Sequence, residues 1–200
     1  KDPETGRYAG PRAAIVTSNN TELVKLPFSD RDCIACLWHP AKHSKVVVAS
    51  IYMDITQEVI TPGLKKTVEF AKQNKHPLII ACDSNAHAHL WGMDQSNPRG
   101  EALEDFILTE NLMVCNLGTT PTFQINDKKS IIDLTLTSDA LYYEIKSWRV
   151  NEEDSQSDHK RIEFIMDDAH DYDTPKTFRY SKADWTKFTE LLDVPCKEWR

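Results

Sequence analysis

One stretch of the chain, PLIIACDSNAHAHLWG at residues 77–92, indicates both the class of fold and the place of a site. Its apolar beginning predicts a buried strand that ends near Cys82. Asp83 and Asn85 follow directly, and a continuing extended backbone would place both side chains on the same side. A carboxylate and an amide at a strand end can reach a metal ion, a water molecule or a phosphate. The alternative is an Asx turn that closes the strand.

Composition narrows the classes of protein. The chain has 200 residues, 40% of them hydrophobic, which suits one domain with a sizeable core. No apolar run approaches the roughly 20 residues of a membrane span, so we expect no membrane partner. Five scattered cysteines indicate reduced intracellular thiols rather than a disulfide framework. The net charge of −7 argues against general nucleic-acid affinity, so a DNA-binding face would have to be local.

Strands and helices are expected in a mixed order. Thr61 and Pro62 are typical of the N-cap and first residue of a helix, and a second amphipathic helix is expected over residues 99–111. Strands are expected over Ala13–Thr17, Cys33–Trp38, Val46–Tyr52, Leu78–Cys82, Thr122–Ile125, Ser130–Thr137, Ile145–Val150 and Arg161–Met166. Because strands often follow one another, with two helices set between them, we expect an α+β or α/β sandwich.

The character of the sequence changes after Met166. Residues 167–176 are acidic and polar without periodicity, which predicts a linker. A short amphipathic helix is expected from Ser181 through Leu192. We therefore expect one domain over residues 1–166, followed by a linker and a short helix over residues 167–200 that lead toward a further domain.

Asp133 and His159 are further candidates for chemistry. Asp133 alternates with apolar residues in an expected strand, and a buried carboxylate there would need a cation, a histidine or a metal. The alternative is a polar strand face open to water. The side chains of Ser157, Asp158 and His159 diverge and cannot form a triad, but His159 could pair with Asp133. An imidazole so supported can hold a phosphate oxygen or move a proton, whereas the alternative is a surface-loop histidine.

Two apparent metal patterns do not meet the spacing of known metal sites. His87 and His89 flank an alanine, but no further histidines stand at a ligand spacing, so we expect them to serve loop structure. Cys33 and Cys36 are followed by two histidines without the roughly dozen residues between pairs that a zinc finger needs, so we expect buried thiols. Nucleophile-elbow, phosphate-loop and dinucleotide motifs are missing from the sequence.

Three segments taken together resemble the endonuclease/exonuclease/phosphatase superfamily, and in particular the apurinic/apyrimidinic-type endonuclease domain of non-LTR retrotransposons. They are residues 83–92, 131–138 and 157–159, and GTTPTF at residues 118–123 strengthens the retrotransposon branch. Their order and spacing hold over about residues 10–166. The resemblance implies a DNase I-like α/β fold, a four-layer αββα sandwich with its site at one edge of two packed sheets.

The resemblance also implies a reaction and its residues. The reaction would be hydrolysis of a DNA phosphodiester with Mg²⁺, or else Mn²⁺, which neutralises charge on the leaving oxygen. Asp83 would activate or orient the attacking water, and Asn85 would hold that water or the phosphate. Tyr52 would contact the phosphate. Asp133 would polarise His159, which would stabilise the transition state.

Further expectations concern the metal and the partners. Asp158 would lie near the metal. The loop over residues 124–129 corresponds to a hairpin that approaches a DNA groove in this family, so contacts with double-stranded DNA are expected from Gln124, Asn126, Lys128 and Lys129. Lys160, Arg161 and Arg99 could extend such a basic face. Residues 180–185 resemble the connector before a reverse transcriptase, which implies that domain in the same polyprotein and an intracellular, nuclear site of action.

The sequence departs from the family pattern in three places. Cys82 stands where the family usually has glycine, and Met53 follows Tyr52 where a Pro-Asn pair is usual. Nothing in residues 1–30 matches the opening strand and the Gln-Glu pair whose glutamate is the principal metal ligand. We therefore expect this chain to start after that segment, to lack its N-terminal strand and to bind metal poorly.

The expected function is that of a metal-dependent DNA endonuclease that nicks target DNA for target-primed reverse transcription. One alternative is a phosphatase or phosphodiesterase of the same superfamily that acts on a small phosphorylated molecule or lipid. Another is a catalytically dead fragment that binds DNA or protein. Salt-dependent DNA affinity separates the first two, and Mg²⁺ binding separates the third.

Overall fold

The computed structural model describes residues 10–18, 21–40, 43, 45–151, 153 and 155–166. Its centre is a six-stranded sheet in the order β1-β2-β3-β4-β8-β5. The neighbours β3 and β4 are parallel, whereas the other neighbouring pairs are antiparallel. The strands of this sheet are β1 (Leu23–Lys25), β2 (Cys33–Trp38), β3 (Val46–Tyr52), β4 (Leu78–Asp83), β5 (Leu112–Val114) and β8 (Asp133–Ser138).

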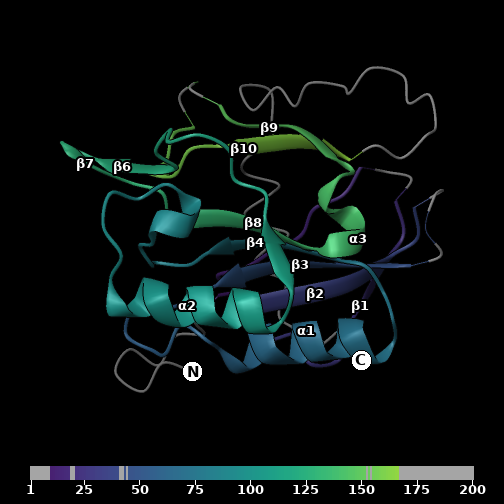
Figure 1. Ribbon diagram of the computed structural model, residues 1–200. Helices are drawn as coiled ribbons and strands as arrows, with labels where there is room; N and C mark the ends of the chain where they lie inside the picture. The colour runs from purple at the N-terminus through teal and green to yellow at the C-terminus, as the bar shows by residue number, and fades with distance from the viewer. Residues whose placement is uncertain are drawn as a thin grey trace. The chain divides into compact units, whose positions relative to one another are not determined.

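Two helices cover one face of this sheet (Figure 1). Each begins with a side-chain cap followed by proline, which fixes the first turn in a helical conformation. The Thr61 hydroxyl accepts a hydrogen bond from the Leu64 N–H at 3.2 Å, and the Asn97 amide oxygen accepts one from the Gly100 N–H at 2.7 Å. The helices of this layer are α1 (Pro62–Gln73) and α2 (Pro98–Thr109).

Alternation along the central strands separates two cores. Val47, Ala49 and Ile51 of β3 point into the main core, which is shared with the two helices. The intervening residues face a second sheet, in which β9 (Ile145–Val150) pairs antiparallel with β10 (Ile162–Met166). A smaller core of Val46, Ile79 and Leu141 lies on that side, the last contributed by the short helix α3 (Asp139–Tyr142). This order of layers confirms the predicted mixed α/β sandwich.

Two smaller elements lie near the ends of the central strands. The strands β6 (Phe123–Ile125) and β7 (Lys128–Ser130) form an antiparallel hairpin that projects from the body of the domain (Figure 1). The loop after β4 contains the short 3₁₀ helix η1 (His89–Trp91), whose Trp91 side chain is buried in the main core. Within the described ranges, no helix has the length and apolar character that a membrane crossing requires.

Two expectations about the strands are wrong. Ala13–Thr17 forms no strand; the N–H groups of Arg12 and Ala13 instead donate to the Arg31 carbonyl at 2.8 and 3.3 Å. The two edge strands of the central sheet, β1 and β5, were not predicted, because three residues are too short for a pattern. The strand expected over residues 130–137 is divided in two, because the Ile132 N–H bonds to a threonine hydroxyl at 3.1 Å rather than to a neighbouring strand. The predicted linker and helix beyond residue 166 lie outside the described residues.

Candidate active site

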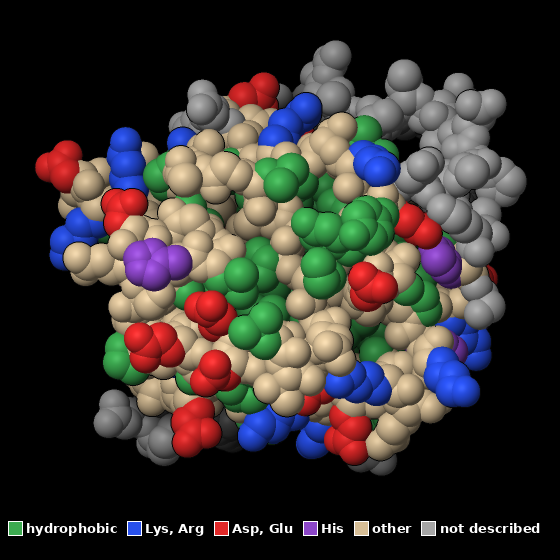
Figure 2. All heavy atoms as spheres, in the orientation of Figure 1, with side chains coloured by type: hydrophobic (Ala, Val, Ile, Leu, Met, Phe, Trp, Pro, Cys, Tyr) green, Lys and Arg blue, Asp and Glu red, His purple; other side chains and the backbone are tan. Residues whose placement is uncertain are grey.

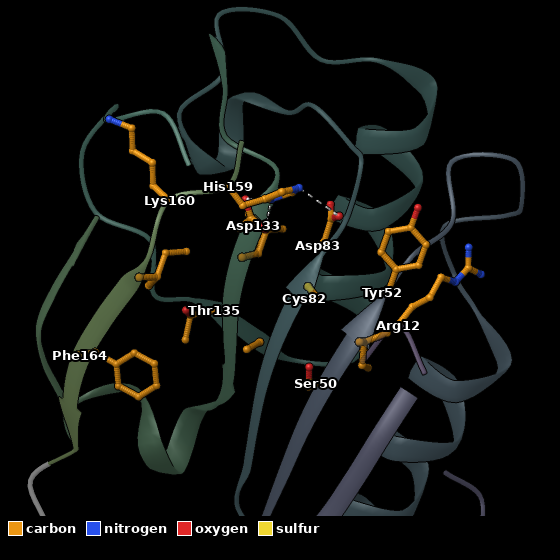
Figure 3. A pocket seen from close by; sticks show the side chains of 14 residues that line it. Arg12, Ser50, Tyr52, Cys82, Asp83, Asp133, Thr135, His159, Lys160 and Phe164 are labelled. Carbon is orange, nitrogen blue, oxygen red and sulfur yellow. Dashed lines mark hydrogen bonds and ion pairs between the residues drawn. The ribbon is translucent and has the colours of Figure 1, made fainter. Parts of the chain in front are cut away.

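Three of the predicted site residues lie in one row across the sheet. Tyr52 at the end of β3 is the register partner of Asp83, which ends β4, and Asp83 is the partner of Asp133, which begins β8. Their neighbours along these strands point into the main core, so these three side chains share the opposite face. They line a cavity of about 650 Å³ between the central sheet and β10 (Figure 3).

His159 joins this row from the loop before β10. Its Nδ1 lies 2.9 and 3.0 Å from the two carboxylate oxygens of Asp133, and its Nε2 lies 3.8 Å from Oδ2 of Asp83 (Figure 3). The hydrogen bond with Asp133 raises the pKa of His159, against the opposing effect of burial. His159 therefore pairs with Asp133, which was one of the two alternatives that the sequence left open. This pairing leaves Nε2 directed at Asp83.

The negative charge of Asp83 is only partly neutralised by the groups around it. Burial raises its pKa, and the negative charge of Asp133 raises it further. His159, the Asn85 N–H and Arg99 oppose this shift only in part. A cation placed between the two carboxylates would remove the repulsion.

The donor atoms fit a divalent cation. Ligand atoms of Asp83, Asp133 and His159 all lie within 4.8 Å of one another. The two carboxylates supply the oxygen ligands that Mg²⁺ and Mn²⁺ prefer, and His159 can offer only Nε2, because Nδ1 bonds to Asp133. Asp158 is exposed and is not part of this cluster, so its expected place near the metal stays a prediction.

The base of the β6–β7 hairpin supports the Asp133–His159 pair. The buried Thr122 hydroxyl accepts a hydrogen bond from the Asp133 N–H at 3.0 Å, and the Thr122 carbonyl accepts one from the Lys160 N–H at 2.7 Å. The ring of Phe123 meets the His159 imidazole edge-on with centroids 4.9 Å apart. In the sequence, residues 118–123 marked only the family resemblance, and their support of the Asp133–His159 pair was not predicted.

Asn85 does not follow the geometry expected from a continuing strand. The strand ends at Asp83, and the positive φ of 48° at Asn85 turns the chain away. The Asn85 N–H donates to Oδ1 of Asp83 at 3.3 Å, which is the Asx turn that the sequence offered as the alternative. Its side-chain amide donates to the Met53 carbonyl at 3.2 Å. The continuing strand on which the same-side placement depended is therefore absent, and contact of Asn85 with water or phosphate stays a prediction.

Arg12 is a site residue that the sequence analysis missed. Its guanidinium lies 4.4 Å from the centroid of the Tyr52 ring. Its Nε and Nη2 each donate to Asp32 at 2.6 Å, and its Nη1 donates to Asp54 at 2.5 Å. Hydrogen bonds from Thr56 and from Arg12 hold the pKa of Asp54 well below its usual range. No motif marks Arg12, because its acidic partners are 20 and 42 positions away.

The residues expected to contact DNA are exposed on the projecting hairpin, and Figure 2 shows basic and acidic side chains side by side there. The positive φ of 52° at Asn126 lies in its turn. The other basic candidates differ from this group. Arg161 pairs with Glu153 and Glu163, and all recorded bonds of Arg99 run to backbone carbonyls. The exposed hairpin candidates are Gln124, Asn126, Lys128 and Lys129.

The two patterns that lacked metal-site spacing are structural. Nδ1 of His89 lies 3.0 Å from the Met93 carbonyl oxygen, within its own loop. Cys33 and Cys36 are buried free thiols, as predicted. Within the described residues, neither pair belongs to a cluster with metal-binding geometry.

The fold and the row of Tyr52, Asp83 and Asp133 with His159 are those of a DNase I-like α/β domain. The family model described as endonuclease-reverse transcriptase matches residues 46–163, and the chain belongs to this family. The predicted resemblance to the endonuclease/exonuclease/phosphatase superfamily and to retrotransposon endonucleases is confirmed. No curated protein shows a significant match.

Solved structures show the same fold at low sequence identity. The endonuclease domain of TRAS1, a telomere-specific non-LTR retrotransposon, superposes with a TM-score of 0.67 at 21% identity, over 76% of this chain and 71% of that one. The 3′ phosphatase NExo from Neisseria, bound to a product DNA hairpin, gives 0.52 at 18% identity, over 76% and 72%. The AP endonuclease LMAP from Leishmania major gives 0.54 at 12% identity, over 68% and 55%. The predicted DNase I-like fold is therefore confirmed.

Proposed function

We propose that this chain is a metal-dependent DNA endonuclease domain that nicks target DNA and leaves a 3′-hydroxyl primer. The primer would serve a reverse transcriptase domain of the same polyprotein, in the nucleus. The observation that carries the proposal is the His159–Asp133 pair facing Asp83 in one cavity, in a chain that belongs to the endonuclease-reverse transcriptase family. The TRAS1 domain, an endonuclease of a non-LTR retrotransposon by its description, supports the choice of substrate.

The reaction needs a water proton removed and charge on the phosphorus oxygens stabilised. The water oxygen forms a bond to phosphorus, and the bond from phosphorus to the 3′ oxygen breaks. Asp83 would orient this water and accept its proton. His159 would donate from Nε2 to a phosphate oxygen while Asp133 holds its Nδ1, and the Tyr52 hydroxyl would bind the same phosphate.

Asp83 and Asp133 are the carboxylates that would hold the metal, while Nε2 of His159 keeps its proton for the phosphate oxygen. A divalent ion bound there would neutralise negative charge on the leaving 3′ oxygen. Mg²⁺ is the expected ion and Mn²⁺ the expected substitute, because both bind carboxylate oxygens.

The test is nicking of supercoiled plasmid by the purified protein with Mg²⁺, with Mn²⁺ and with chelator. Asp83→Ala and His159→Ala should each lower the nicking rate by about 10²-fold or more, because each removes a group that handles a proton or transition-state charge. His89→Ala is the matched control, since His89 is exposed and bonded within its own loop. Absence of nicking, or nicking that survives both site substitutions, would overturn the proposal.

The net charge of −7 favours a second candidate, a phosphatase of the same superfamily acting on a small phosphorylated molecule. Such an enzyme would use the same row of residues without a DNA-binding surface. It would release inorganic phosphate from a phosphomonoester, and it would show no salt-dependent affinity for duplex DNA. A protein that neither hydrolyses phosphate esters nor takes up Mg²⁺ in calorimetric titration would instead be a binding module.

A further inference from the structure

The side chain of Arg99, from the first turn of α2, connects two loops at the site. Its Nη2 donates to the carbonyls of Met53 and Asp54 at 2.8 and 3.0 Å, and its Nη1 donates to that of Gln57 at 2.5 Å. Its Nε donates to the Ser84 carbonyl at 3.1 Å. One guanidinium therefore binds four backbone oxygens of the segments that follow β3 and β4.

These two segments carry site residues. Met53 directly follows Tyr52, and Ser84 directly follows Asp83. The segments are also bonded to each other, since the Met53 N–H donates to the Asp83 carbonyl at 2.9 Å. The guanidinium thus extends the β3–β4 ladder beyond its last residue pair, into a region where the strands no longer hold the backbone.

Contacts at the start of α2 hold the backbone of Arg99 in place. Gly100 packs so closely on the His87 carbonyl that a Cβ there would collide with it. Asn97 bonds to the same residue, because its N–H donates to the His87 carbonyl at 2.9 Å and its side chain accepts from the His87 N–H at 3.3 Å. The helix and the loop after β4 therefore form one unit, from which the guanidinium reaches the loop after β3.

The chemistry of this contact requires arginine. The guanidinium is planar and has five N–H groups in a fixed fork, so it can bond to carbonyls that lie in different directions. Lysine carries its three donors on one atom and cannot reproduce bonds from Nε and both Nη atoms. The partly buried position of Arg99 makes any unmade bond costly, since a charged group there has little access to water.

We propose that Arg99 is a positioning residue that holds Tyr52 and Asp83 in their working separation through the two loops it connects. The inference rests on the proposed function, because it concerns the same site. Arg99 has no place in the cavity lining, so it acts through the backbone and not on the phosphate. A misplacement of about 1 Å at a catalytic group can cost roughly 10²-fold in rate, which sets the size of the expected effect.

The test compares Arg99→Ala and Arg99→Lys in plasmid nicking under steady-state conditions. Arg99→Ala should lower kcat by roughly 10–100-fold while KM for DNA changes little, because the loss is in geometry and not in DNA contacts. Arg99→Lys should keep the charge but recover only a small part of kcat. Added guanidinium ion should partly restore Arg99→Ala. Arg149→Ala is the control, since Arg149 is exposed and pairs with Glu163 on the neighbouring strand, and it should nick at the wild-type rate.

A folded Arg99→Ala protein with wild-type kcat, or one whose loss lies in KM alone, would overturn the inference. If circular dichroism shows that Arg99→Ala does not fold, Arg99→Lys decides, and wild-type kcat in a folded Arg99→Lys protein would overturn it equally. Wild-type protein that does not nick DNA would overturn the proposed function, which is a different result from nicking that is indifferent to Arg99.

Discussion

Asp83 and Asp133 are direct partners across the β4–β8 ladder, and both carboxylates lie on the same face of the sheet. Like charges directly opposite each other destabilise a sheet. Burial and this repulsion together raise the pKa of Asp83. The repulsion between the two carboxylates therefore destabilises the metal-free fold, and a bound metal would explain why the pair is present. Removal of this repulsion by substitution should thus increase stability and decrease activity.

Asp83→Asn should stabilise the metal-free protein and abolish nicking. An amide keeps the shape of the side chain and removes the repulsion, which is worth roughly 0.2–1 kcal/mol for a cross-strand pair. Urea unfolding in the presence of chelator, at a pH above the raised folded-state pKa of His159, measures the gain. Asp94→Asn, at an exposed position, serves as control. A destabilised Asp83→Asn protein would contradict the interpretation of the pair.

Asp133→Asn should lower the pKa of His159, because it weakens the hydrogen bond that raises it. In the wild-type protein the folded-state pKa lies above the unfolded value of 6.5. The stabilisation is therefore complete below about pH 6.5 and is lost as the pH rises through the folded-state value. NMR titration of the imidazole protons measures the shift, and unfolding below and well above pH 6.5 should show a flatter dependence in the variant. An unchanged titration would show that Asp133 does not support the ring.

Thr122→Val should destabilise the protein and slow nicking together. The hydroxyl accepts hydrogen bonds from the Ile132 and Asp133 N–H groups at 3.1 and 3.0 Å. Valine has a similar shape but no hydroxyl, so both N–H groups would lose their acceptor. Loss of a buried partner of this kind costs about 1–3 kcal/mol. Denaturant unfolding measures the change, and exposed Thr120→Val is the control. Full stability in Thr122→Val would mean that water replaces the hydroxyl without loss.

Replacement of Lys128 and Lys129 by alanine should weaken DNA binding and leave catalysis intact. Each lysine that contacts a phosphate contributes about one unit to the slope of log affinity against log salt, so the double variant should lose about two. At saturating DNA the nicking rate should match that of wild type, because the hairpin tip lies outside the cavity. Lys65→Ala and Lys66→Ala on α1 provide the control. A salt slope that does not change would remove the hairpin from the DNA-binding surface.

Much of the fold could be predicted because the signals are local. The helix start at Pro62 was predicted from Thr61 and the proline, and α2 was predicted from its amphipathic stripe, although it starts at Pro98 rather than at residue 99. The strands β3 and β4 were predicted from apolar runs of strand length. The edge strands β1 and β5 could not be predicted, since three residues have no period. Residues 13–17 show the opposite case. Their sequence pattern is typical of a strand, but they form no strand because no neighbouring strand pairs with them.

The sequence by itself determined that Tyr52 ends one strand and that Asp83 directly follows another, whereas Asp133 was expected inside a strand and begins one in the structure. Only the tertiary structure decided that His159 turns its Nε2 to Asp83, and that Arg12 lies against the ring of Tyr52. It also decided that Arg99 bonds to four carbonyls instead of facing DNA. The physical reason is the distance along the chain over which each kind of interaction acts. Alternation and capping act between residues a few positions apart, whereas these contacts join segments whose spacing in the chain has no period.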